Sequence, residues 1–484
     1  MKLSILHISD LHRDPGNPIS NAALLSSLLQ DIDNAATEEP SIPRPELIIV
    51  SGDVIQGTEK DTGEASAVLN AQYDQAEEFL GQLSDELVAG DRQKIVIVPG
   101  NHDINFPCMF SALEEVEYTN GDADQKRRLS DAIWEEQSKY RWSWAEFKLY
   151  KIIDQAKYDQ RLNEFIAFYD KFYHGTRQYS NEVSEQFDTF DYPAWNLVVT
   201  GLNSCFLNDP WNRIGIVHPR AFANACGELR SRQFRGRLRL AVWHHSTKGA
   251  PRQDDYMDSD FLQQLVNHGF SLGFHGHQHK PELIDEKFAF GGERKVNALS
   301  ASTLAGGKRA LSPGGTRGYN RVVLDLDDWT VELHVRQMVN SSFLAPIWSK
   351  GFLPNQKSFE TFSLQEPRPF DPATIVTQDL PECIKLIENK EYEKAVEILE
   401  PVSSHNETAK RLLLDALVGL GNNAGIITHF SNPISPQEII AVTDAMWEEN
   451  RHDELRSVLG QRLVAEHEDA SVVHIRKKYL SRLN

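Results

Sequence analysis

Five short clusters of Asp, Asn, His and Gly each directly follow a β-rich run, and they constrain the fold more than any other feature of the sequence. They are Asp10-Leu-His12, Gly52-Asp53, Gly100-Asn-His-Asp103, Trp243-His-His245 and Gly276-His-Gln-His279. Polar side chains at the carboxyl ends of neighbouring strands converge on the crevice where open α/β sheets place their sites. The sequence therefore predicts an α/β fold in which these clusters form one site.

The pattern of strands and helices divides the first 345 residues into three stretches. Up to residue 103, β-rich runs alternate with helical stretches that begin near Ala22 and Ala65, which is typical of a layered α/β arrangement. Residues 104–191 form a charged, aromatic-rich insertion that we expect to be helical. Beyond it, strand-like runs follow one another with few helices between them, so we expect the rest of this core to be largely sheet.

The last part of the chain has no strand signals. A Pro-containing linker, which we place at residues 346–375, leads into residues 376–484, where apolar residues recur at helical spacing. The successive helical hairpins of this last segment resemble a short tetratricopeptide-like solenoid, without a strict repeat period. The sequence thus predicts a core at 1–345, a linker and a helical repeat-like domain.

The chemistry-bearing residues of the clusters offer oxygen or imidazole nitrogen, a donor set that suits manganese, iron or zinc. In Asp10-x-His12 and His277-x-His279, an extended backbone would direct both side chains to one side, so that each pair could hold one ion. The four cysteines show no CxxC spacing, so we expect neither a disulfide framework nor a thiolate metal site.

In order along the chain, the clusters match DxH, GD, GNH(D/E), H and GHxH, the pattern of the calcineurin-like metallophosphoesterase superfamily. The chain resembles this superfamily over roughly residues 1–340, apart from the insertion. The resemblance implies a layered β-sandwich core flanked by helices and two divalent ions, for which we expect manganese ahead of iron or zinc. The implied ligands are Asp10, His12, Asp53 and His279 for one ion, and Asp53, Asn101, His244 and His277 for the other. His245 is the alternative to His244, which we favour.

The resemblance also implies a reaction, in which a metal-bridged hydroxide attacks a phosphoester. His102 would face the leaving group as general acid or electrostatic stabiliser. Asp103 either orients His102 or bonds to backbone amides of its own turn. Further basic residues are candidates to contact substrate phosphate, namely Lys248, Arg252, Lys308, Arg309 and Arg317.

The second cluster, SGDVIQGT, lacks the arginine of the GDxVDRG signature of phosphoprotein phosphatases. We therefore expect a nucleotide phosphodiesterase, with an Mre11-like nuclease as the enzymatic alternative and a protein-binding scaffold as the non-enzymatic one. The net charge of −20 opposes non-specific attraction to nucleic acid. The helical tail is a candidate surface for a protein partner. No apolar run is long enough for a membrane helix, so we expect a cytoplasmic protein without a membrane partner.

Overall fold

The computed structural model divides the chain into two units, residues 1–367 and 368–484. It describes the whole chain except residues 59–62, 119–121, 134, 136–137, 235, 250–254, 259, 288–294, 308–310, 312–314, 341–344, 368–379, 381–382, 402, 405 and 484. Among the described residues, no helix combines the length and apolarity needed to cross a bilayer.

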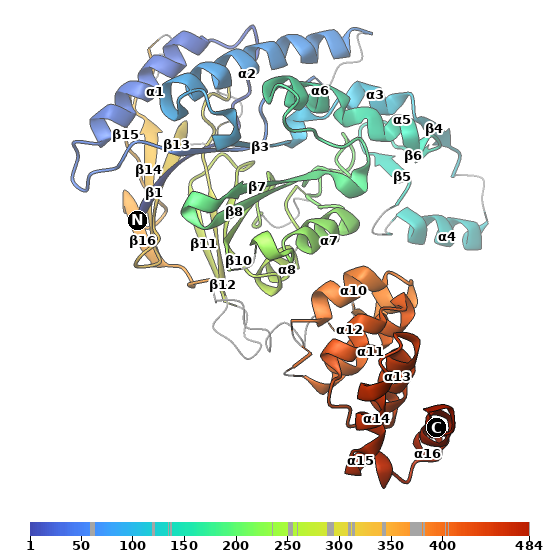
Figure 1. Cartoon of the computed structure of the whole chain (residues 1–484). Coiled ribbons are helices and arrows are strands. Elements are labelled where there is room, and N and C mark those ends of the chain that lie inside the picture. The colour runs from blue at the N-terminus through green and yellow to red at the C-terminus, as the bar shows by residue number, and fades with distance from the viewer. Residues whose placement is uncertain are drawn as a thin grey trace. The chain divides into compact units, whose positions relative to one another are not determined.

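Two sheets form the centre of the first unit (Figure 1). The first sheet has the strand order β15-β14-β13-β1-β2-β3, with β16 also paired to β14. Its strands are β1 (Lys2–Ile8), β2 (Leu47–Ser51), β3 (Ile95–Val98), β13 (Gly318–Asp325), β14 (Thr330–Met338), β15 (Trp348–Lys350) and β16 (Phe359–Ser363). Within it, β1, β2 and β3 are parallel, whereas β13 runs antiparallel to β1.

The second sheet has the order β11-β12-β10-β9-β8-β7. Its strands are β7 (Phe187–Tyr192), β8 (Leu197–Leu202), β9 (Leu238–Val242), β10 (Phe270–His275), β11 (Glu282–Lys287) and β12 (Lys295–Ser300). The four strands β8, β9, β10 and β12 are parallel. Because parallel strands are buried on both faces, they are nearly continuous apolar runs here, as in LRLAV of β9.

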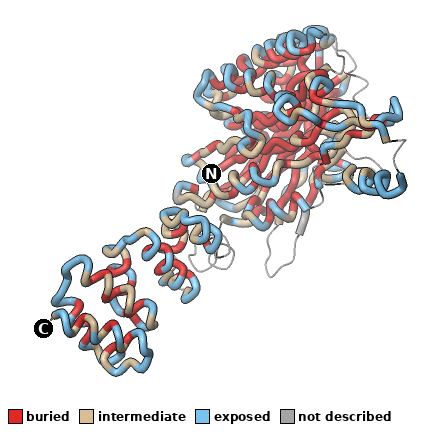
Figure 2. Tube along the Cα trace, turned by 90° about the vertical axis from the view of Figure 1, so that its right-hand side faces the viewer, coloured by how far each residue is buried: buried red, intermediate tan, exposed pale blue. Residues whose placement is uncertain are grey.

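Helices cover the outer faces of both sheets. Helices α1 (Asn21–Ala35) and α2 (Ala65–Val88) share one apolar core with both sheets, whereas α7 (Pro219–Glu228) and α8 (Phe261–Asn267) pack on the second sheet alone. Figure 2 shows the buried residues gathered between these layers. Ser20 begins α1, since its side chain accepts a hydrogen bond from the Ala23 amide. The expected layered β-sandwich core flanked by helices is therefore confirmed.

The insertion differs from the helical segment that we expected. It contains helices α3 (Phe106–Phe110), α4 (Ala123–Ile133), α5 (Gln155–Asp159) and α6 (Asn163–Phe172), but also a three-stranded sheet of β4 (Leu113–Val116), β5 (Tyr140–Ser143) and β6 (Lys148–Ile152). Burial alternates along β5, so this segment has the period of a strand, which its aromatic and charged composition concealed. Its last residues form β7 of the second sheet.

The predicted linker is also partly wrong. Strands β15 and β16 lie within 346–375 and both pair with β14, so the core continues to about the boundary of the first unit. Their shortness explains why the sequence did not reveal them, because three to five residues give too few alternations for a clear strand pattern. Most of the remaining linker, residues 368–375, lies outside the described residues, as do residues 376–379 at the start of the predicted helical domain.

The second unit is helical in its described residues and has its own apolar core. Its helices are α10 (Tyr392–Leu399), α11 (Glu407–Leu420), α12 (Asn423–His429), α13 (Pro436–Glu448), α14 (His452–Gly460), α15 (Arg462–Ala465) and α16 (Ala470–Leu483). The Asn406 side chain caps the start of α11 by accepting hydrogen bonds from two backbone amides. Gly421, in the left-handed backbone conformation, ends the helix. Helices α10 and α11, and likewise α12 and α13, contact each other as consecutive pairs.

Candidate active site

The structure brings the seven candidate ligands together at the carboxyl ends of parallel strands from both sheets. They are Asp10 and His12 after β1, Asp53 after β2, Asn101 after β3, His244 after β9, and His277 and His279 after β10. We call these seven residues the ligand cluster. Their convergence follows from the topology, because the same ends of both sheets meet at one place.

The backbone at the ligand cluster is not extended. Asp10, His12, Asp53, His277 and His279 have φ between 44° and 74°, the left-handed region that side chains other than glycine rarely adopt. The expectation that i and i+2 share a side because the segment is extended is therefore wrong, although both pairs do point into the cluster. The chain turns sharply after each strand, and these turns direct the side chains inward.

One group of contacts centres on Asp10. The Oδ1 atom of Asp10 lies 3.0 Å from His279 Nε2 and 3.9 Å from His12 Nε2. The two imidazole nitrogens are 3.4 Å apart, and His12 Nε2 lies 3.9 Å from Asp53 Oδ2. Asp10, His12 and His279 thus offer three ligand atoms close enough to hold one ion.

A second group of contacts lies on the other side of Asp53. Its Oδ1 atom is 3.3 Å from His244 Nε2, which is 3.0 Å from Asn101 Oδ1. His277 Nδ1 lies 2.9 Å from the same amide oxygen and 3.3 Å from His244 Nε2. The two oxygens of Asp53 therefore face different groups, which is the geometry that a bridging carboxylate needs.

The two adjacent histidines of the fourth motif have different surroundings. His244 donates from Nδ1 to the Ser51 carbonyl at 2.9 Å, which leaves its Nε2 lone pair facing the ligand cluster. His245 instead contacts Ser204 Oγ and Asn208 Oδ1, each at 2.9 Å, through its two ring nitrogens. The geometry favours His244 as the candidate ligand and leaves His245 as a support of the surrounding loops.

The donor set fits divalent cations. Two pairs of ring nitrogens lie 3.4 and 3.3 Å apart, and Asn101 Oδ1 and the carboxylates point at the same space. Hydrogen-bond acceptors therefore converge there with too few donor protons between them. Burial, followed by the neighbouring His102, lowers the pKa of His12 to about 3 and keeps it neutral. A neutral imidazole beside ionised carboxylates is the protonation state that metal binding requires.

The carboxylates set the charge of the site. Burial alone would raise the pKa of Asp53, but His244 and His102 outweigh it and hold the pKa well below its usual range. In turn, burial lowers the pKa of His244 and Asp53 raises it more, to about 9. The second group of contacts therefore attracts a positive charge, which a bound cation would supply in place of the proton.

Two motif glycines allow the loops to approach one another this closely. A Cβ atom at Gly100 would overlap the backbone nitrogen and Oδ1 of Asp53, and one at Gly276 would overlap Ser9 Oγ and Asp10 Oδ2. The glycines before Asn101 and His277 are thus needed for packing against the opposite carboxylates.

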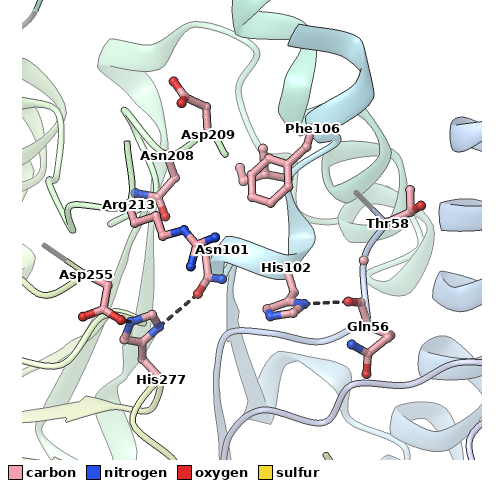
Figure 3. A pocket seen from close by; sticks show the side chains of 12 residues that line it. Gln56, Thr58, Asn101, His102, Phe106, Asn208, Asp209, Arg213, Asp255 and His277 are labelled. Atoms are coloured by element: carbon pink, nitrogen blue, oxygen red, sulfur yellow. Dashed lines mark hydrogen bonds and ion pairs between the residues drawn. The ribbon is translucent and has the colours of Figure 1, made fainter. Parts of the chain in front are cut away.

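His102 lies at the border of the ligand cluster and is 36% exposed. Its Nδ1 donates to the Gln56 carbonyl at 2.6 Å, and its Nε2 lies 4.0 Å from Asp53 Oδ2 (Figure 3). The carbonyl of Gln56 fixes the ring and leaves Nε2 as the atom that can exchange a proton with a substrate. Nothing in the sequence singled out Gln56, because its contribution comes from the backbone.

The carboxylate of Asp103 does not contact the ring of His102. Its carboxylate is buried and accepts from the amides of Gly100 at 2.7 Å and Val54 at 3.2 Å, while the Tyr73 hydroxyl donates to it at 3.2 Å. The ring of His102 is oriented by Gln56 instead. The structure therefore supports the second of our two expectations, in which Asp103 fixes the turn that carries Asn101.

A pocket of about 410 Å³ opens beside the ligand cluster (Figure 3). Its lining residues come from the loop after β2, the start of the insertion, the loop after β8 and the motif segments: Gln56, Gly57, Thr58, Asn101, His102, Ile104, Phe106, Asn208, Asp209, Arg213, Asp255 and His277. Asp255 lies 3.7 Å from Nε2 of His277, whose Nδ1 faces Asn101. The sequence indicated only the motif residues among these, because most of the others lie in loops without a recognisable pattern and Phe106 begins the short helix α3.

The two predicted basic contacts that lie in the described part of the chain, Lys248 and Arg317, do not line this pocket. Lys248 is exposed and does not line it, and Arg317 is buried with its Nε donating to the Gly306 carbonyl at 2.8 Å. Arg252, Lys308 and Arg309 lie outside the described residues. Arg213, an arginine that does line the pocket, was not predicted.

Carboxylate, amide and imidazole groups arranged in this way define a candidate metal-dependent hydrolytic site. The model of the family described as calcineurin-like phosphoesterase matches residues 3–281, more than half of the chain. The chain therefore belongs to the calcineurin-like phosphoesterase family, for which phosphoester hydrolysis with two divalent metal ions is typical. A search of curated proteins found no match.

Solved structures add only distant likenesses. Vps29 from Entamoeba histolytica is 10% identical, both as a single mutant and as the wild type complexed with zinc, with TM-scores of 0.24 and 0.25. Each match covers 75% of this chain and 100% or 99% of the other. The calcineurin-like phosphoesterase YfkN from Bacillus subtilis is 9% identical, with a TM-score of 0.26 and coverage of 85% and 98%. The family assignment rests on the family model.

Proposed function

We propose that this chain is a two-metal phosphodiesterase acting on nucleotides. The observation that carries the proposal is the pair of contact groups that share Asp53, one with Asp10, His12 and His279 and the other with Asn101, His244 and His277. We expect manganese in both positions, because mixed carboxylate and imidazole sites accept it readily.

Each residue has a defined part in this proposal. Asp53 would hold both ions, since its two oxygens face different groups of ligands. The Ser51 carbonyl and Asp255 fix the rings of His244 and His277 through their outer nitrogens. When bound, two divalent ions would polarise the phosphoryl group and activate water as the nucleophile.

His102 is proposed to protonate or stabilise the leaving group. The Gln56 carbonyl accepts a hydrogen bond from Nδ1–H of His102. Nε2 is therefore the ring atom directed at the substrate. The ring is partly exposed and lines the pocket, which gives the leaving oxygen access to it. Replacing the ring should affect substrates with poor leaving groups most, because they need the proton most.

The pocket supports a nucleotide as the substrate. Its volume of about 410 Å³ lies within the usual range for small-ligand sites. Ile104 and Phe106 provide apolar surface next to polar groups of the loop after β2, so a base or sugar could pack there while phosphate reaches the ligand cluster (Figure 3). This combination fits a mononucleotide group better than a bare phosphate.

The direct test is metal-dependent hydrolysis of bis-p-nitrophenyl phosphate and p-nitrophenyl phosphate after removal and return of Mn²⁺. Asp53→Asn should lose activity on both compounds, and His102→Ala should lose activity as well. Asp33→Asn, an exposed carboxylate on α1, is the matched control and should behave as the wild type. Equal activity in all four proteins would contradict the proposal.

A second panel should rank cyclic mononucleotides, cyclic dinucleotides, single-stranded and duplex DNA, and RNA. Preference for a small nucleotide would support the proposal. Efficient cleavage of DNA would instead favour an Mre11-like nuclease.

For the second unit we propose a tetratricopeptide-like role in binding a protein partner. The consecutive helix pairs and the separate apolar core support a unit that folds as stacked hairpins. Loss of a co-purifying partner after deletion of residues 376–484, with phosphodiesterase turnover retained, is the expected result; an unchanged partner set would contradict it. We also propose a cytoplasmic location, with which the thiol state of Cys108, Cys205 and Cys226 agrees.

A further inference from the structure

Arg213 is an exposed cation that lines the pocket, and its charge, after that of His277, helps to lower the pKa of Asp255. Of the three charged residues in the loops lining this side, Asp209 pairs with Arg141 and Asp255 lies 3.7 Å from His277 Nε2. Within the part of the chain that the structure describes, Arg213 makes no hydrogen bond or ion pair. An exposed guanidinium that lines a pocket without a hydrogen bond or ion pair to the described residues keeps its N–H donors available to a ligand anion.

The loop that carries Arg213 connects β8 to α7 and is held by the insertion. Arg141 of β5 pairs with Asp209, and its guanidinium also donates to the Tyr158 hydroxyl at 2.9 Å. That hydroxyl in turn donates to Asp209 at 2.5 Å. Arg141, Tyr158 and Asp209, which we call the clamp, are 4%, 1% and 0% exposed, so the loop is fixed by a buried ion pair.

Aromatic packing reinforces the clamp two residues further on. Trp211 stacks on Tyr150 of β6 with ring centroids 4.7 Å apart, and its edge meets Phe110 of α3 at 5.7 Å. The insertion therefore contacts the loop through two of its strands, β5 and β6, and two of its helices, α3 and α5.

Hydrogen bonds within the loop complete its shape. Asp209 and Asn212 exchange backbone bonds of 2.8 and 3.2 Å, and Asn208 Nδ2 donates to the Ile214 carbonyl at 2.6 Å. Asn208 also contacts His245 Nε2 at 2.9 Å, which ties the loop to the segment after β9. Arg213 thus extends from a backbone that is already ordered before substrate arrives, which reduces the entropy cost of binding.

We propose that Arg213 binds a second anionic group of the substrate, such as a phosphate that is not hydrolysed. This inference rests on the proposed phosphodiesterase function and names a substrate class for it, nucleotides that carry a further phosphate. The reacting phosphate would have the bound metal ions and His102 for its charge, so a cation elsewhere in the same pocket would serve another group. A planar guanidinium can bind two phosphate oxygens at once, whereas lysine offers only a point charge.

The test compares two chromogenic esters that differ only in the second anion. Thymidine 5′-(p-nitrophenyl phosphate) and the same compound with a 3′-phosphate release the same p-nitrophenolate from the same reacting group. With Mn²⁺-loaded full-length protein, the ratio of kcat/KM for the two esters isolates the contribution of the 3′-phosphate. Wild type should favour the 3′-phosphorylated ester, and Arg213→Ala should reduce that preference at least about tenfold, as expected for one charge-assisted contact.

Arg213→Lys should retain part of the preference. Arg220→Ala is the matched control, because Arg220 is an exposed arginine at the start of α7 that does not line the pocket. Far-ultraviolet circular dichroism and the thermal midpoint should show that all variants fold.

The outcomes separate this inference from the proposed function. Turnover of both esters with no preference in wild type, or a preference that Arg213→Ala leaves intact, would overturn the role of Arg213 and leave the phosphodiesterase function standing. Release of p-nitrophenolate from neither ester by folded, metal-loaded wild type would overturn both.

Discussion

Two regions of the first unit bury several polar side chains, and they do so with opposite results. In the clamp, donors and acceptors are matched, because Arg141 and the Tyr158 hydroxyl together satisfy the Asp209 carboxylate. In the ligand cluster, carboxylate oxygens, an amide oxygen and imidazole nitrogens face one another without enough protons to pair them. The clamp is complete within the protein, whereas the ligand cluster would be completed by the proposed cations.

This difference separates residues that position from residues that bind. A buried charge without a partner is costly, so a chain retains such a group only where something else compensates it. The clamp holds the loop of Arg213, and the ligand cluster holds the proposed metal ions. Four changes test this distinction.

The largest effect on turnover is expected from replacing His244, and its neighbour His245 is the comparison. His244→Asn removes a ligand atom from the second position, and turnover of bis-p-nitrophenyl phosphate should fall roughly 1,000-fold, since a metal ion supplies several kcal/mol to the transition state. His245→Asn should retain two ions per chain by metal analysis, because both its ring nitrogens contact Ser204 and Asn208. The opposite pattern of metal loss would show that the two histidines are assigned the wrong way round.

Breaking the clamp should cost stability. Arg141→Met leaves the fully buried Asp209 carboxylate without its cation, a change that costs about 3–5 kcal/mol of unfolding free energy. The double variant Arg141→Met/Asp209→Asn removes the unpaired charge and should recover part of that loss in urea unfolding. A double variant as unstable as the single one would mean that packing, not charge, sets the role of Arg141.

Completing the ligand cluster should add stability. An ion that binds only the folded protein contributes about 2.7 kcal/mol at a concentration 100 times its Kd. Adding Mn²⁺ to chelator-treated protein should therefore raise the thermal midpoint of the first unit. His244→Asn should show a smaller rise, and an identical rise in both proteins would place the ions elsewhere.

The smallest effect concerns a histidine beside the ligand cluster whose contacts lie within the protein. His7 on β1 contacts Ser51 Oγ at 3.0 Å and Asn320 Nδ2 at 3.3 Å, and burial, with His275, lowers its pKa from 6.5 to about 3. Between these two values the unfolded chain binds a proton that the folded chain does not. The stabilising contribution is complete above pH 6.5 and is lost as the pH falls towards 3.

His7→Gln should therefore flatten the fall of unfolding free energy between pH 6.5 and 4.5 by up to about 1.4 kcal/mol per pH unit. Urea unfolding in the presence of chelator measures the slope without bound ions. His174→Asn, at an exposed position, should keep the slope of the wild type. A slope that is unchanged by His7→Gln would mean that His7 is protonated in the folded protein.

The sequence predicted most of the ligand cluster because its residues belong to short motifs at strand ends, and the topology alone brings strand ends together. It could not predict the turns, since the left-handed backbone at Asp10 and His277 arises from contacts between distant segments. Gln56 acts through its carbonyl, which every residue possesses. Arg213 depends on a loop whose shape is set by Asp209 and its contacts far along the chain.

The same limit applies to the fold. The apolar runs of β9 and β10 are long enough to predict strands, whereas β15 has three residues and is stabilised by pairing with β14. The strands of the insertion are amphipathic and rich in aromatic residues, a composition that also suits helices. Local sequence therefore predicted the central layers, while the edges depended on their partners.

The left-handed residues of the ligand cluster imply a conflict between durability and activity. Five non-glycine residues at positive φ each cost on the order of 1–3 kcal/mol that the rest of the fold must offset. Glycine at His12 or His279 would relax this strain while removing an imidazole. A laboratory selection for heat resistance alone would therefore tend to produce robust but inert descendants of this protein, and screens for improved variants need to score turnover alongside survival.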